Sequence, residues 1–371
     1  MNFDLTEDEE LLKAAVERFV ADRYDAERRR AYQREDAGFS RENWRMLGEM
    51  GFIAAPFAEA DGGLGLGATA IGTMFEALGR GMVVEPLGEN ALFATRLFAL
   101  AAPTDLRGAW LPLLLAGERR IAVAHAEAGG RGGRLWVETR AEGNGRGLRL
   151  FGGKPYVVAG AGADAYLVSA RARGAPDDLA GWTFHFVPAD APGLVARSWR
   201  AADGGQAVAL TLEGVEVMPG SQLADGAAAL DEASLMADLA RAAESLGIME
   251  AMFADTLTYL RTREQFGSPI GKFQAIQHRM VKQYAILAQA RALLELAMMS
   301  DGKPGFAAAV HGARAYIARA ALPLGHEMIQ FHGGMGVTDE LAIGHGHKRL
   351  LMLSRWPDDG EAALDRYAGT A

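Results

Sequence analysis

The chain has 371 residues, of which 50% are hydrophobic and 23% are charged, and its formal net charge is −9. This length suffices for more than one packed domain, and the negative charge argues against broad, charge-driven binding to nucleic acid. The sequence contains no cysteine, which excludes disulfides, thiolate metal sites and a thiol nucleophile. The N-terminus is acidic, and no apolar stretch approaches the roughly 18 residues of a membrane span. We therefore expect a soluble, unsecreted, cytoplasmic protein with no membrane partner.

The N-terminal third of the chain has a helical pattern. Thr6 and Glu9 have the spacing of a capping box, and apolar residues then recur at helical intervals as far as Asp25. A glycine-rich break at residues 61–67 follows no predicted strand and belongs to no βαβ unit, so we do not expect a dinucleotide-binding loop there. We predict a helical domain over residues 1–119.

The pattern changes after residue 120. Short runs rich in β-branched and aromatic residues alternate with glycine and aspartate turns, namely IAVAHA, LWVETRA, LRLFG, YVVAG, AYLVSA, WTFHFV and AVALTL. No long helical period interrupts them, and their spacing is typical of an antiparallel β domain. We predict a barrel-like antiparallel β domain over residues 120–225.

The helical period returns in the last part of the chain. Apolar residues from Leu235 to Phe253 recur at steps of three and four, and two further long helical stretches lie at 274–299 and 306–331. We predict a four-helix bundle within residues 226–371. The predicted fold class is therefore α+β and multidomain, in the order helical, β, helical.

Two segments of the last domain carry candidate binding residues. In RTREQFGSPIGKFQ, residues 261–274, a helix breaks at a Gly-Ser-Pro turn and a new helix starts near Phe273. Arg263, Phe266 and Gln274 gather a cationic fork, an aromatic ring and an amide, which can hold a phosphate and stack on a planar ring. The alternative is an ordinary helix C-terminus with favourable arginine charges.

The second segment is QFHGGMG, residues 330–336. Its glycines, Gly333 and Gly334, allow a ligand to approach the backbone after a long helix, and Gln330 precedes them. The alternative is a plain helix C-cap. In GHGHKRL nearby, the two histidines are two residues apart and do not share a helix face. We therefore expect a basic segment near a phosphate or a subunit contact there and no metal site.

Together these two segments resemble the most recognisable elements of the acyl-CoA dehydrogenase family. The resemblance extends over nearly the whole chain, including residues 74–86, 152–154 and 212–217. The GHGHKRL ending is similar to that of a bacterial branch that often acts on CoA esters of dicarboxylic acids, such as pimeloyl-CoA, or of steroid side chains. Many members of that branch assemble as unlike pairs of subunits.

The resemblance implies FAD as cofactor, held between the β domain and the C-terminal helices. Residues matching Arg263, Phe266 and Gln274 reach the FAD of a neighbouring subunit, and those matching Gln330, Gly333 and Gly334 lie near its adenosine pyrophosphate. The implied partners are an acyl-CoA substrate, further like or unlike subunits in a tetramer, and an electron-transfer flavoprotein as acceptor.

The catalytic base departs from the family pattern. In many members a Glu stands close to the C-terminus where this chain has Trp356-Pro357. Asp358 and Asp359 follow one and two residues later and are weaker candidates for the base. In other members the Glu stands where this chain has Ala237. Glu244 lies about two turns after Ala237 on the same helix face, among small residues that leave room for a thioester, and it is our candidate base. The alternative is a surface glutamate paired with Arg241, three residues earlier.

The flavin side departs as well. The family usually has threonines at the positions of Ala126 and Val158, and their hydroxyls contact the flavin ring. Three hypotheses remain open, of which the third is a catalytically silent homotetramer. In the first, the chain is an enzyme that desaturates an acyl-CoA with Glu244 as base. In the second, it is a non-catalytic or half-site subunit that completes the FAD site of a partner.

Overall fold

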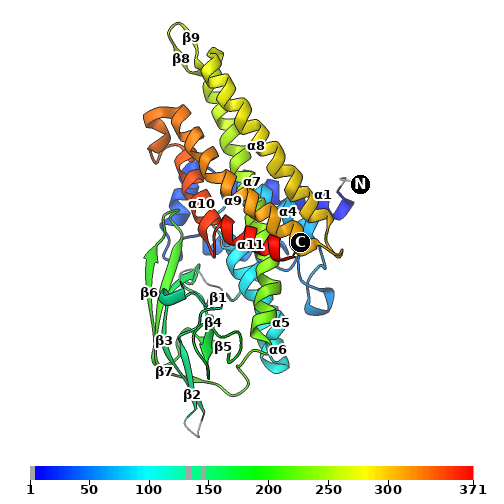
Figure 1. Cartoon of the computed structure of the whole chain (residues 1–371), viewed down its shortest axis with the longest axis vertical. Coiled ribbons are helices and arrows are strands. Elements are labelled where there is room, and N and C mark those ends of the chain that lie inside the picture. The colour runs from blue at the N-terminus through cyan, green and yellow to red at the C-terminus, as the bar shows by residue number, and fades with distance from the viewer. Residues whose placement is uncertain (1–4, 131–134, 144–146, 371) are drawn as a thin grey trace. The chain divides into compact units, whose positions relative to one another are not determined.

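The computed structural model describes residues 5–130, 135–143 and 147–370 (Figure 1). The chain divides into two compact units, each assembled from separate segments. Unit 1 comprises Met1–Ala31, Gly67–Val83 and Asp238–Ala371, and unit 2 comprises Tyr32–Leu66 and Val84–Ala237. The three predicted domain ranges stay a prediction, and their end residues 1–4 and 371 lie outside the described residues.

The N-terminal segment is helical, as predicted. The capping box forms at its first helix: the Thr6 amide donates to Glu9 Oε2 at 2.8 Å, and the Glu9 amide donates to Thr6 Oγ1 at 3.3 Å. These bonds satisfy two amides that would otherwise lack partners at the helix start. The helices are α1 (Glu7–Arg23), α2 (Ala26–Gln33), α3 (Arg41–Glu49), α4 (Ala68–Arg80), a π-helical stretch (Leu87–Thr95), α5 (Arg96–Ala101) and α6 (Thr104–Leu115).

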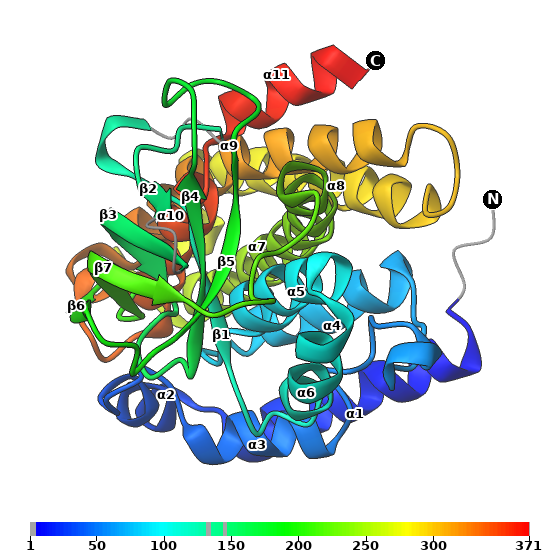
Figure 2. The ribbon, with the colours of Figure 1, turned by 90° about the horizontal axis from the view of Figure 1, so that it is seen from below.

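The β segment of unit 2 forms one curled sheet. Its strands follow the order β1-β4-β2-β3-β7-β6, and β5 lies off this path and pairs with β4. Figure 2 shows β3, β6 and β7 on one side of the curl and β4 and β5 on the other. The strands are β1 (Ile121–Ala124), β2 (Arg140–Gly143), β3 (Leu148–Val158), β4 (Ala165–Arg171), β5 (Trp182–Pro188), β6 (Leu194–Arg200) and β7 (Gln206–Val217).

The sheet is mixed, whereas the sequence predicted an antiparallel domain. β1 and β2 both run parallel to β4, and the remaining pairs are antiparallel. A parallel pair needs a long crossover, and the β2–β3 hairpin lies within the connection from β1 to β4. Alternation of apolar residues does not reveal this, because it reports burial and not strand direction.

Two apolar cores stabilise unit 2. Leu150, Val168 and Leu210 belong to the core on one face of the sheet. Phe98, Leu114 and other residues of α5 and α6 pack with strand residues such as Phe184 in the second core. The sheet is therefore covered on both faces along β4, and all seven β4 residues are buried.

The C-terminal segment of unit 1 is a helical bundle. In this bundle α9 packs against α8, α10 and α11. The N-terminal helix α4 of the same unit packs against both α1 and α8. No helix in the described part of the chain is both long and apolar enough to cross a bilayer. The predicted fold class of helical, β and helical segments is confirmed. The elements are α7 (Gly226–Thr262), β8 (Glu264–Gln265), β9 (Ser268–Pro269), α8 (Gln274–Met299), α9 (Phe306–His332), α10 (Ala342–Arg355) and α11 (Gly360–Thr370).

Candidate functional site

The first predicted binding segment is a tight hairpin between two long helices. α7 ends at Thr262, β8 pairs with β9, and α8 begins at Gln274, next to the predicted start at Phe273. Phe266 and Gly267 both have positive φ, 54° and 78°, which suits a two-residue hairpin turn. Figure 1 shows this hairpin as a projecting tip of unit 1. A phenylalanine at positive φ is sterically costly, and such strain is often found at functional positions.

The side chains of this hairpin face solvent. Phe266 is 94% exposed, and Arg263 and Gln274 are exposed as well. Within residues 5–130, 135–143 and 147–370, neither polar side chain has a hydrogen-bond or ion-pair partner. A free guanidinium, a free amide and an exposed ring are therefore available to a phosphate-bearing aromatic ligand.

The second predicted segment lies at the end of α9. Gly333 has φ 59° and follows the last residue of the helix. A Cβ atom built on Gly333 or on Gly334 would meet no atom within 4 Å, so the backbone here is open to a ligand. The Gln330 side chain is exposed, and among the described residues it too has no hydrogen-bond partner.

Contacts between helices hold the second segment against the two helices that flank the hairpin. Tyr259 lies one turn before Arg263, and its ring stacks on His332 with centroids 4.4 Å apart. Arg279 on α8 lies over the Phe331 ring at 4.7 Å. The end of α7, the start of α8 and the end of α9 therefore meet at one end of unit 1.

Glu244 lies elsewhere on α7. It is 18 residues before Thr262, which corresponds to roughly 27 Å along the helix axis. The residue is only 8% exposed. Arg349 on α10 donates from Nε to Glu244 Oε1 at 2.6 Å and from Nη2 to Oε2 at 3.0 Å. The candidate base is therefore a buried carboxylate held by a two-pronged arginine contact.

The predicted alternative for Glu244, a surface pair with Arg241, is wrong. Arg241 is 2% exposed and donates to Asp238 at 2.9 Å. The sequence rule for residues three apart applies to exposed helix faces, and this face of α7 is buried. Sequence reasoning missed Arg349, because that residue lies in a different helix 105 positions away.

The two weaker base candidates both have structural partners. Asp358 is 7% exposed, and both its carboxylate oxygens accept from Arg366. Asp359 precedes α11 and caps it, accepting the amides of Glu361 and Ala362 at 3.1 Å each. Its second oxygen accepts from Arg355 at 3.4 Å. Both carboxylates are therefore engaged in holding α11.

The β domain contains a buried ion pair next to Ala126, the position at which the resemblance implies a threonine. Lys154 is fully buried and donates to Glu127 and to Ser169 Oγ, the latter at 2.8 Å. Burial lowers the pKa of Lys154 to about 8. Although burial alone would raise the pKa of Glu127, the contact with Lys154 and bonds from Thr139 hold it below its ordinary value. The pair fixes the backbone on both sides of Ala126, and no side-chain hydroxyl is available at that position.

The two histidines of the GHGHKRL segment have different partners. His345 donates through Nε2 to the Asp339 carbonyl at 3.0 Å. The His347 ring lies against that of His326, with centroids 4.6 Å apart. Within the described ranges, no group of three or more acids and histidines is arranged to hold a metal ion.

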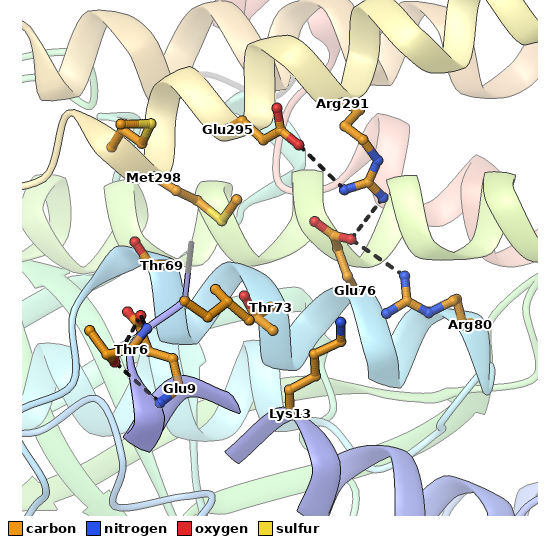
Figure 3. A pocket seen from close by; sticks show the side chains of 12 residues that line it. Thr6, Glu9, Lys13, Thr69, Thr73, Glu76, Arg80, Arg291, Glu295 and Met298 are labelled. Atoms are coloured by element: carbon orange, nitrogen blue, oxygen red, sulfur yellow. Dashed lines mark hydrogen bonds and ion pairs between the residues drawn. The ribbon is translucent and has the colours of Figure 1, made fainter. Parts of the chain in front are cut away.

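A charged cavity of unit 1 contains none of the predicted site residues. It has a volume of about 500 Å³ and lies between α1, α4 and α8 (Figure 3). Glu76 accepts from Arg291 at 3.0 Å and from Arg80 at 3.4 Å. Burial raises the pKa of Glu76 despite both arginines. Because these charges are paired with one another, we assign them to holding α4 and α8 together.

Comparison with known proteins gives one family. The model of the acyl-CoA dehydrogenase N-terminal domain matches residues 6–118, and that of the acyl-CoA dehydrogenase C-terminal domain matches residues 225–357. The acyl-CoA dehydrogenase IpdE2 of Mycobacterium tuberculosis is 30% identical over 358 residues, an alignment that covers 94% of each protein. The chain belongs to the acyl-CoA dehydrogenase family. The family consists of oxidoreductases that act on CH–CH bonds.

Two further similarities fit the bacterial branch that the sequence resembles. The acyl-CoA dehydrogenase FadE27 of Mycobacterium tuberculosis is 29% identical over 349 residues, covering 92% of this chain and 90% of the relative. The crystal structure of the ChsE4-ChsE5 complex from the same organism superposes with a TM-score of 0.88 and 27% identity, covering 100% of this chain and 98% of that chain. The resemblance to the acyl-CoA dehydrogenase family and its steroid-type bacterial branch is confirmed.

Proposed function

We propose that this chain is a FAD-dependent acyl-CoA dehydrogenase that desaturates the α,β bond of an acyl-CoA thioester. The observation that carries the proposal is the meeting of two open polar segments at one end of unit 1. One presents Arg263, Phe266 and Gln274, and the other presents Gln330 and the backbone at Gly333–Gly334. Membership of the acyl-CoA dehydrogenase family supports FAD as their common ligand.

The residues of this end suit the two halves of FAD. The Arg263 guanidinium is a donor for a pyrophosphate, and the open space at Gly333 and Gly334 lets a ligand approach the backbone closely. The exposed Phe266 ring offers a stacking surface, and the Gln274 amide can donate or accept at a ring edge. FAD, when bound, supplies the acceptor for the β hydrogen, which leaves as hydride.

The separation along α7 favours a cofactor site shared between subunits. Glu244 and the hairpin are separated by roughly 27 Å along α7. A single chain would therefore not bring Glu244 and the hairpin side chains to the same reacting atoms. In our proposal the hairpin and the α9 end complete the FAD site of a neighbouring subunit. Each Glu244 serves the substrate bound to its own chain.

Glu244 is the proposed base for the α proton. It is a buried carboxylate with an ionised partner, and general bases in enzymes are commonly carboxylates placed in this way. Two of its lone-pair directions are used by Arg349, and an ionised carboxylate has about four. A lone pair therefore remains for the α proton of the thioester.

The spectrum of the purified chain tests this proposal. We expect a yellow protein whose flavin absorbance is bleached by an acyl-CoA in the absence of oxygen. Glu244→Gln should retain the yellow colour and lose about 10²- to 10⁴-fold in turnover, the usual contribution of a general base. Asp359→Asn, which changes an exposed cap, is the matched control. Unchanged turnover in Glu244→Gln would exclude Glu244 as the base.

A second candidate function is a half-site subunit that completes a partner's FAD site without catalysing. Ala126 and Val158 favour it, because neither offers the hydroxyl that the family usually directs at the flavin. ChsE4-ChsE5 is a complex of two named proteins, which supports a hetero-oligomeric arrangement here. The chain purified alone would then be colourless and would gain flavin only on co-expression with a paralogous dehydrogenase subunit.

The remaining partners follow from the family. We propose assembly as a homo- or hetero-tetramer, a CoA ester of a dicarboxylic or steroid side-chain acid as substrate, and an electron-transfer flavoprotein as acceptor. The names of the relatives support the acyl-CoA class. We also propose a cytoplasmic location, which a chain of this length without cysteine supports.

A further inference from the structure

The environment of Glu244 contains a residue that no sequence motif identifies. Arg349 contacts both oxygens of the Glu244 carboxylate, at 2.6 Å and 3.0 Å. The glutamate side chain is 10% exposed and the arginine side chain 26%. Both partners are thus largely removed from water, where a two-pronged contact is stronger than at a surface and fixes the carboxylate plane.

The helix that carries Glu244 is held rigidly at that position. α4 crosses α7 so closely that a Cβ atom on Gly79 would lie 2.3 Å from the Glu244 carbonyl oxygen. One turn later on α7, a Cβ on Gly247 would lie 2.1 Å from the Glu76 carbonyl oxygen. The two glycines therefore allow backbone-to-backbone contact, which fixes the Glu244 Cα atom and leaves only its side-chain torsions free.

The helix that carries Arg349 is fixed to the same unit. Gly346 lies one turn before Arg349 on α10, and a Cβ atom there would meet the Met252 sulfur at 2.8 Å and the Met82 methyl at 3.0 Å. Met252 is on α7, two turns after Glu244. The backbone of α10 thus lies directly against a side chain of α7, and both partners of the ion pair stand on helices, so the pair is preorganised and does not depend on a flexible loop.

We infer that Arg349 is a positioning residue for Glu244, which fixes the direction of its carboxylate before the α proton is removed. This inference rests on the proposed function. The two-pronged contact orients the remaining lone pairs of the carboxylate, and a misplacement of about 1 Å costs about 10²-fold in rate.

The test compares three substitutions on α10. Arg349→Gln removes the charge and one prong, and Arg349→Lys keeps the charge without the fork. Arg355→Gln is the matched control, because Arg355 lies on the same helix with a 61% exposed side chain. The measurements are kcat and KM with the CoA ester of a dicarboxylic or steroid side-chain acid and an artificial electron acceptor, together with flavin content and a crystal structure of each variant.

We expect Arg349→Gln to lower kcat by roughly ten- to a hundredfold with little change in KM. Arg349→Lys should recover only part of kcat, because an ammonium keeps the charge but lacks the fork that fixes the carboxylate plane. Arg355→Gln should match the parent in both respects.

Two results would overturn the inference. One is an Arg349→Gln variant with the same kcat and KM as the parent and only a reduced thermal stability. The other is a variant crystal structure in which the Glu244 carboxylate keeps its direction without Arg349, and this readout does not require turnover. A failure of the proposed function itself looks different, since Glu244→Gln would then turn over as fast as the parent, whatever Arg349 does.

Discussion

At the scale of single residues, His185 has an unusual environment for a titratable group. It lies in the middle of β5, is 2% exposed, and its Nδ1 atom has no hydrogen-bond partner in the described structure. Burial lowers its pKa from the ordinary 6.5 to about 4. The folded protein therefore keeps this imidazole neutral under conditions in which the unfolded chain protonates it.

The protein should lose stability as the pH falls from about 6.5 to about 4. Over that range the unfolded state binds more protons at this position than the folded state, so lower pH favours unfolding. A difference of about 2.5 pH units corresponds to about 3 kcal/mol at most. Chemical denaturation at pH 7, 5.5 and 4 measures the effect.

His185→Phe is the control for that prediction. Phenylalanine has a similar shape and no proton to gain, so its stability should fall less over the same pH range. Parallel curves for parent and variant would assign the acid loss to other groups and contradict the role of His185.

Sequence reasoning located the candidate base and misjudged what surrounds it. Glu244 follows from the helical repeat, which places it two turns after Ala237 on the same face. Its partner does not follow, because Arg349 comes from another helix and only packing brings it near. The same limit applies to Asp358, whose contacts with Arg366 and α11 cannot be read from its place in the sequence.

At the scale of elements, the strands missed by the sequence have identifiable causes. β6, Leu194–Arg200, is exposed along nearly its whole length, so it lacks the alternating pattern that marks a half-buried strand. LRLFG and YVVAG were predicted as separate runs and form the single strand β3. The register with β7 shifts between Lys154 and Val157, around Pro155, and proline is accepted in sheets at such bulges.

The crossing of α4 and α7 leads to a prediction about Gly79. Alanine normally stabilises a helix interior relative to glycine by about 1 kcal/mol. At this position its Cβ would lie 2.3 Å from the Glu244 carbonyl oxygen, so the helices would have to separate. Gly79→Ala should therefore lower the melting temperature, with an overpacking cost of about 1–3 kcal/mol, and should reduce turnover by displacing Glu244.

Gly108→Ala is the matched control. Gly108 lies inside α6, and a Cβ atom there would meet nothing within 4 Å. This variant should be more stable than the parent by about 0.5–1 kcal/mol. If Gly79→Ala raised the melting temperature as Gly108→Ala is expected to do, the close crossing of α4 and α7 would not constrain the residue at position 79.

At the scale of the whole molecule, the sequence predicted the order of structural classes and not how the chain is divided. Composition and periodicity change near residues 120 and 226, and the secondary structure changes with them. The compact units instead combine distant segments: unit 1 joins Gly67–Val83 to Asp238–Ala371. α7 contributes residues to both units. Hydrophobic periodicity reports the secondary structure of each segment, and it does not show which distant segments pack together.

A shared FAD site has a consequence for mixed oligomers. In our proposal Glu244 acts on substrate bound to its own chain, and Arg263 with Phe266 acts on the FAD of a neighbour. Glu244→Gln alone should be inactive because its base is missing. A chain with both Arg263→Gln and Phe266→Ala should be inactive alone, because every FAD site loses its neighbour's contacts.

Co-expression of these two variants should restore activity. In a mixed pair, the chain that keeps Glu244 receives an intact hairpin from its partner, so one of the two sites in the pair is complete. Random pairing across a two-fold interface makes about a quarter of all sites complete, and selection for mixed pairs raises this fraction to about half. The measurement is turnover per flavin after purification through tags of both kinds. Mixtures of separately purified variants, in which subunits do not exchange, serve as the control and should stay inactive. Inactive co-expressed pairs that contain both chains would show that the hairpin acts within its own chain, and the shared-site arrangement would be wrong.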